Sequence, residues 1–164
     1  MHEVTIIFRN LCKLMIKCPA TTCALLLAAV VLTGCGGGDV QNELKALEGT
    51  WKLVAAEEGG QAIPQDKLPA ISFTFQPDGT STVRGPEGEF QTRSSVDPTK
   101  NPKTIDIVFL SGPLKGRQQY GIYKVEGDRQ TVVATLADAK AEDRPVDFTT
   151  KGTKTRLMVW QREK

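Results

Sequence analysis

From residue 49 to the end of the chain, apolar and polar residues alternate in short runs that are separated by turn-forming residues. The clearest run is 104–110, which carries Ile105, Ile107 and Phe109 on alternate positions. Alternation places every second side chain on the same face of a strand. Nine strands are predicted, over residues 50–56, 71–76, 80–84, 89–96, 104–110, 118–125, 130–136, 145–149 and 156–162. This pattern predicts an all-β protein, an antiparallel up-and-down barrel of about 8–9 strands, because closure leaves no exposed sheet edge.

A helical period precedes the alternating region. Val40, Leu44 and Leu47 recur at the spacing of one helix face, which predicts a short helix over residues 40–47. We expect this helix to close one end of the barrel. The proline-containing connection 61–70 is expected to form a lid over the other end.

The apolar face of each predicted strand should point into the barrel. These positions are Leu53, Ala55, Phe73, Phe75, Phe90, Ile105, Ile107, Phe109, Tyr123, Val125, Val133, Leu157 and Val159. A barrel of about eight strands is either filled by its own side chains or holds one small ligand, and the sequence leaves both arrangements open. The candidate ligand-lining residues are Phe73, Phe75, Phe90, Ile107, Phe109 and Tyr123.

Residues 1–34 have the pattern of an export signal. Arg9, Lys13 and Lys17 form a basic region, and residues 22–32 form an uncharged run of 11 residues. A transmembrane helix needs about 20 apolar residues, so this run is too short for a membrane anchor and is typical of a cleaved signal peptide.

The signal ends in Leu32-Thr33-Gly34-Cys35, which resembles a bacterial lipobox. In that motif the chain is cleaved between Gly34 and Cys35, and the cysteine thiol then carries a lipid. We therefore expect residues 35–40 to be a lipidated linker and residues 41–164 to be one barrel domain. The predicted location is the cell envelope, on the periplasmic or outer-surface side of a bacterial membrane, with the lipid on Cys35 as anchor.

Removal of the signal changes the charge of the chain. The whole sequence has 21 Lys and Arg and 19 Asp and Glu, and the loss of three basic residues (Arg9, Lys13, Lys17) and one acidic residue (Glu3) leaves 18 of each. Nucleic-acid binding depends on the neutralisation of phosphates by basic side chains. A domain without net side-chain charge is therefore not expected to bind nucleic acid, and we expect it to be a monomer.

The same cleavage removes most of the reactive side chains. Cys12, Cys18 and Cys23 lie in the signal, and His2 is the single histidine of the sequence. The mature chain thus lacks an internal disulfide, Ser-His and Cys-His nucleophile pairs, and imidazole zinc ligands. We expect neither enzyme activity nor a metal or cofactor.

Several motifs resemble an uncharacterised lipocalin-like domain family of exported bacterial proteins and lipoproteins. They are Leu47-Glu48-Gly49-Thr50-Trp51, Asp97-Pro98-Thr99-Lys100-Asn101-Pro102-Lys103-Thr104-Ile105-Asp106, Gly112-Pro113-Leu114-Lys115-Gly116, Gly121-Ile122-Tyr123 with Gly127-Asp128, Arg144-Pro145 and Arg162-Glu163-Lys164. The likeness covers essentially the whole mature domain and implies a lipocalin-like barrel. It also implies that Trp51 plugs the barrel floor beside a basic side chain of the last strand, with Arg162 as first choice and Arg156 as second.

Two classes of function remain open. The leading hypothesis is a membrane-tethered module that binds a small apolar or amphipathic molecule in the barrel, as the lipocalin resemblance implies. The alternative is an envelope protein-interaction or inhibitor module with a solid core, which would contact its partner through loops 97–103 and 111–116.

The acidic residues of the strands and turns are interpreted as structural. Asp97 precedes a proline and should cap a turn, although loop position also suits partner recognition. Asp106 should face solvent. Two pairs of neighbouring acids are expected on the surface rather than in a glycosidase dyad, namely Glu57 with Glu58 and Glu87 with Glu89.

Cys35→Ser should move the protein from the membrane fraction to the soluble exported fraction, because the lipid attachment site is lost. Cell fractionation followed by immunoblotting measures this. An unchanged membrane fraction would contradict lipid anchoring at Cys35.

Overall fold

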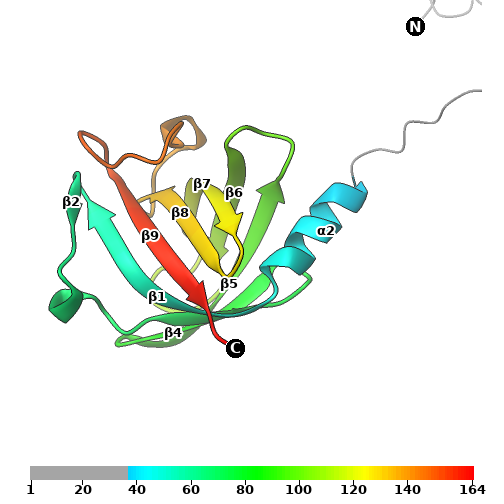
Figure 1. Ribbon diagram of the computed structural model, residues 1–164, viewed down its shortest axis with the longest axis horizontal. Coiled ribbons are helices and arrows are strands. Elements are labelled where there is room, and N and C mark those ends of the chain that lie inside the picture. Colours follow the sequence, from blue (N-terminus) through cyan, green and yellow to red (C-terminus); the bar gives the residue numbers. More distant parts are fainter. Residues whose placement is uncertain (1–36) are drawn as a thin grey trace, which may run out of the picture. The chain divides into compact units, whose positions relative to one another are not determined.

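The computed structural model describes residues 37–164, which form one α-helix, nine strands and two 3₁₀ turns (Figure 1). The helix α2 spans Gly37–Leu47 and the turns are η1 (Gln65–Lys67) and η2 (Ala141–Asp143). The strands are β1 (Gly49–Glu58), β2 (Gln61–Ala62), β3 (Ser72–Phe75), β4 (Thr80–Gly85), β5 (Gly88–Asp97), β6 (Lys103–Phe109), β7 (Gln118–Glu126), β8 (Arg129–Thr135) and β9 (Thr155–Arg162). The predicted signal, its cleavage site at Gly34 and the lipid site at Cys35 lie outside the described residues.

Helix α2 begins three residues before the predicted start at Val40, so residues 37–40 belong to the helix rather than to a linker. Asp39 lies in its first turn, where a negative charge interacts favourably with the helix dipole. Within residues 37–164, no helix is both long and apolar enough to cross a membrane.

Eight of the strands close into an antiparallel up-and-down barrel. They pair in the order β1-β3-β4-β5-β6-β7-β8-β9, and β9 pairs again with β1. The closing register sets Trp51 opposite Arg162 and Leu53 opposite Trp160. β2 is an extra strand that pairs with the end of β1 at Glu57 and Glu58. The predicted fold class is confirmed.

The barrel has two different ends. α2 leads directly into β1, so it lies at the end that holds the β3–β4, β5–β6 and β7–β8 connections and the last residue of β9. We call this the closed end. The open end holds β2, η1 and the β4–β5, β6–β7 and β8–β9 connections; Figure 1 shows α2 beside the C-terminus and β2 on the far side of the barrel. The predicted lid, residues 61–70, therefore lies at the open end.

The predicted strand 145–149 is wrong. This segment belongs to the long connection between β8 and β9. Asp147 Oδ1 accepts a hydrogen bond from the Thr149 amide at 3.1 Å, and local bonds of this kind compete with a sheet ladder. Pro145 also lacks the amide hydrogen that a central strand position needs.

Arg144 fastens the β8–β9 connection to the outer face of β6 and β7. Its Nη1 donates hydrogen bonds to the carbonyls of Gly121 at 2.9 Å and Ile105 at 3.3 Å. Its Nη2 forms an ion pair with Asp106 Oδ1 at 2.6 Å, although the angles of this contact are not those of a hydrogen bond. The guanidinium also lies 5.4 Å from the centroid of the Tyr120 ring. Asp106 faces outward as predicted, but Arg144 partly covers it, so its carboxylate is half-buried rather than fully solvated.

Some predicted interior positions are also wrong. A bulge between Leu53 and Ala55 sets Ala56, rather than Ala55, opposite Met158. On β8 and β9 the residues that face the interior are Gln130, Val132, Ala134, Met158 and Trp160, in place of the predicted Val133, Leu157 and Val159. The reason is that both faces of β8 are buried, with Val133 itself 0% exposed. When both faces of a strand are apolar, the sequence does not alternate, and it does not show which face points into the barrel.

Arg144→Ala should lower the free energy of unfolding by about 1–3 kcal/mol, because two carbonyls lose their donor and the partly buried Asp106 keeps an unpaired charge. Urea unfolding measures the change. Lys140→Ala is the matched control, since Lys140 pairs with Glu142 at 3.4 Å while their side chains are 78% and 74% exposed. The control should change stability by less than about 0.5 kcal/mol. An equally small loss for Arg144→Ala would show that Arg144 does not hold the connection.

Candidate functional site

The barrel contains a cavity of about 490 Å³. Its mouth is lined by Pro69, Pro86 and Leu114, which come from three connections at the open end. Five of the candidate ligand-lining residues line the cavity wall, namely Phe73, Phe75, Phe90, Ile107 and Phe109. The cavity therefore runs from the lid segment into the barrel, along the aromatic face that the sequence predicts.

Tyr123, the sixth candidate, does not line this cavity, and that prediction is corrected. Its side chain is 1% exposed and belongs to the buried cluster that also holds Leu47 and Trp51. Its hydroxyl donates to Glu43 Oε1 at 3.1 Å, and Lys103 Nζ lies 2.8 Å from both oxygens of Glu43. Burial, followed by the charge of Glu43, raises the pKa of Tyr123, so the phenol stays a neutral donor that ties α2 to β7.

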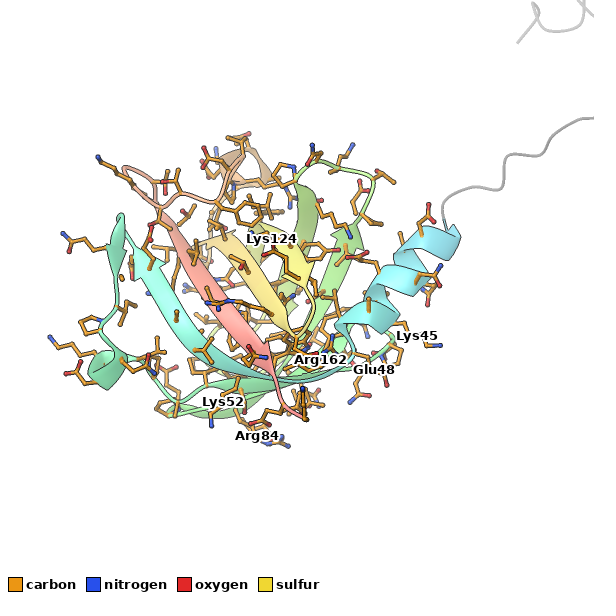
Figure 2. All side chains as sticks on the ribbon, viewed as in Figure 1. Lys45, Glu48, Lys52, Arg84, Lys124 and Arg162 are labelled. Carbon is orange, nitrogen blue, oxygen red and sulfur yellow. The ribbon has the colours of Figure 1, made fainter. Side chains whose placement is uncertain are left out.

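Trp51 and Arg162 lie together at the closed end. Trp51 is 0% exposed, and the central guanidinium carbon of Arg162 lies 4.2 Å from the centroid of its ring. Trp51 Nε1 donates to the carbonyl of Leu47 at 2.8 Å, and Arg162 donates to the carbonyls of Ala46, at 2.7 Å, and Glu48. Figure 2 shows Arg162 and Glu48 together where α2 meets the barrel. The last carbonyls of a helix have no partner within the helix. These donors therefore satisfy the carbonyls at the end of α2 and fix the helix to the barrel floor.

Gly49 makes this arrangement possible. Its φ of +120° is one that L side chains rarely adopt, and a Cβ atom there would lie 3.1 Å from Arg162 Nη1. Arg156, the second choice as partner of Trp51, lies at the open end instead, where its Nη2 is 2.8 Å from Glu58 Oε2.

The cavity wall is mostly apolar but carries polar residues at both ends. Glu87, Gln119 and Arg156 line it toward the open end, and the remaining polar side chains of the lining are buried. These are Ser81, Thr92, Ser94 and Gln130, which are 5%, 5%, 8% and 3% exposed. Gln130 Oε1 has no hydrogen-bond partner in the part of the chain that the structure describes. This polar group was not predicted from the sequence, although the inward positions of β4 and β5 carry serine and threonine.

Apart from Glu87, an exposed residue at the mouth of the cavity, the acidic residues that the sequence singled out bind structural partners. Glu57 accepts from the Thr150 hydroxyl at 2.5 Å, Glu58 pairs with Arg156 at 2.8 Å and Glu89 pairs with Arg84 at 2.7 Å. Asp97 Oδ1 accepts from the hydroxyl and amide of Thr99 at 2.6 and 3.0 Å, and these two bonds lower the pKa of Asp97. Among residues 37–164, no three His, Cys, Asp or Glu side chains are grouped so that they could hold a metal ion.

No protein-family model matches the chain, and no curated protein matches it. What the structure adds to the sequence resemblance is the fold: a closed antiparallel barrel of eight strands with a short helix at one end, consistent with a lipocalin-like fold.

Trp51→Ala should lower the free energy of unfolding by about 3–5 kcal/mol, because it empties a fully buried site and removes a donor from the end of α2. Urea unfolding measures this. Arg156→Ala, which breaks an exposed ion pair with Glu58, serves as control and should cost about 0–1 kcal/mol. A loss below about 1 kcal/mol for Trp51→Ala would contradict its role as the floor of the barrel.

Proposed function

We propose that the protein is an exported lipoprotein, attached to a membrane through Cys35, whose lipocalin-like barrel binds one small apolar or amphipathic molecule. The observation that carries this proposal is the cavity of about 490 Å³. Sites for small molecules typically occupy roughly 300–1,000 Å³ and are concave, mostly apolar and open at one side. A core without such a space would have favoured the alternative, an interaction or inhibitor module.

The lining of the cavity supports an apolar ligand. Phe90 and Phe109 lie with their ring centroids 5.8 Å apart, and Phe73 packs edge-on against Trp160 at 4.8 Å. Rings held in such contacts present a fixed apolar wall. Each methylene that a ligand buries against it contributes about 0.8 kcal/mol. This wall offers binding rather than catalysis, so we propose no enzyme activity.

The test uses the exported protein with Cys35→Ser and the neutral dye Nile red, whose fluorescence rises in an apolar environment. Val83→Trp should abolish the fluorescence increase, because Val83 lines the cavity and an indole there would fill much of it. Thr82→Trp is the matched control, since the neighbouring residue on β4 has its side chain on the other face of the strand. It should bind the dye as the parent protein does, and circular dichroism checks that both variants fold.

Absence of dye binding by the parent protein would overturn the proposal and favour the interaction module. Equal binding by the two tryptophan variants would show that the dye binds outside the cavity.

A further inference from the structure

Three of the buried polar residues that line the cavity lie toward the closed end. Ser81 is the second residue of β4, Gln130 is the second residue of β8, and Ser94 lies near the end of β5. All three positions adjoin the closed end. The mouth is lined by apolar residues such as Pro69 and Leu114, together with the exposed Glu87 and Arg156.

Gln130 is the residue of this group that points to an occupant. It is 3% exposed, and its backbone pairs with Val125 and Trp160, so apolar residues flank it on both neighbouring strands. Its Oε1 lacks a hydrogen-bond partner among residues 37–164, and the side chain lines the cavity. Almost all buried polar groups in native proteins are hydrogen-bonded, so this acceptor calls for a donor, and the cavity that Gln130 lines is the space in which a ligand or a buried water can supply one.

The floor of the cavity carries no charge. Glu87 and Arg156 are the ionisable residues among those that line it, and both are exposed residues from the open end. Arg156 is also paired with Glu58. An ionised head group at the floor would lose its hydration without meeting an opposite charge, which is unfavourable. The donor that reaches Gln130 must therefore belong to a neutral group.

We propose that Gln130 is the head-group contact for a neutral amphiphile that carries a hydroxyl or an amide N–H, in a cavity whose opposite wall carries the hydroxyls of Ser81 and Ser94. This inference rests on the proposed function and specifies its ligand. The head group enters first and donates a hydrogen bond to Gln130 Oε1. The hydrocarbon chain then extends along Ile107 and Phe109 toward the open end.

The experiment measures displacement of Nile red from the Cys35→Ser protein by matched ligands. n-Decanol and nonyl methyl ether are isomers that differ in having and lacking a donor, and decanoate at neutral pH carries a charge. The parent protein should bind n-decanol about tenfold more tightly than the ether, and decanoate more weakly than n-decanol. In Gln130→Met, which keeps the length of the side chain and removes its amide, the ratio of alcohol to ether affinity should fall by about tenfold.

Gln119→Met is the matched control. Gln119 is the second residue of β7, so it lines the cavity near the open end rather than at the floor, and its replacement should leave the ratio unchanged. Gln130→Leu provides a second variant if Gln130→Met fails to fold, which circular dichroism would reveal.

The outcomes separate this inference from the proposed function. Tight binding of all three ligands with a ratio that does not respond to Gln130 would overturn the head-group contact and leave the binding function standing, with a buried water as the partner of Gln130. Tightest binding of decanoate would overturn the neutral class. No displacement and no dye binding by the parent protein would overturn the proposed function and the inference together.

Discussion

The hydrogen bonds from Trp51 and Arg162 to the last carbonyls of α2 are the contacts on which the rest of the barrel depends. An isolated helix of 11 residues is marginal in water, so α2 exists because it is docked. Docking buries Leu44 and Leu47 against the barrel and leaves the helix end to be satisfied by the two donors. The same two side chains fill the floor, because Arg162 stacks on Trp51. Helix and floor therefore stabilise each other, and the cavity above them is closed at one end.

The strands were predictable because their alternation is a local pattern, and the floor was predictable because a motif resemblance marks Trp51 and Arg162. Alternation in runs such as 104–110 reflects one buried face and one exposed face, and it gave every barrel strand to within a few residues. Arg162 was placed beside Trp51 by a motif resemblance, and the antiparallel register of β1 and β9 brings the two residues together. Prediction of the inward-facing residues failed where no residue pattern marks their orientation. The bulge after Leu53 shifts the inward face of β1 by one residue, and no composition signal marks it.

The site was predictable in its apolar part and not in its polar part. Phe73 and Phe109 mark the wall because aromatic residues at alternate strand positions face a core. Gln130 could not be found in the same way, because its strand is buried on both faces and its inward orientation depends on pairing with β9. The segment 145–149 was wrongly predicted as a strand for a related reason. Its residues have strand-like composition, but Asp147 bonds locally to the Thr149 amide, and Arg144 holds the start of the segment against the outside of the barrel.

The two halves of the cavity make different contributions to recognition, and their magnitudes decide which property each controls. Burial of a methylene contributes about 0.8 kcal/mol, whereas one neutral hydrogen bond contributes about 0.5–1.5 kcal/mol, so two or three methylenes outweigh the contact with Gln130. Affinity should therefore follow the length of apolar chain along the wall. Discrimination between head groups depends on the floor of the cavity. A ligand that leaves the buried Gln130 Oε1 unpaired lacks the hydrogen bond, and the desolvation penalty of that acceptor also remains. Because the mouth is open, a long hydrocarbon chain can extend beyond the wall. The structure should therefore be selective for the head group of the ligand and tolerant of its chain length.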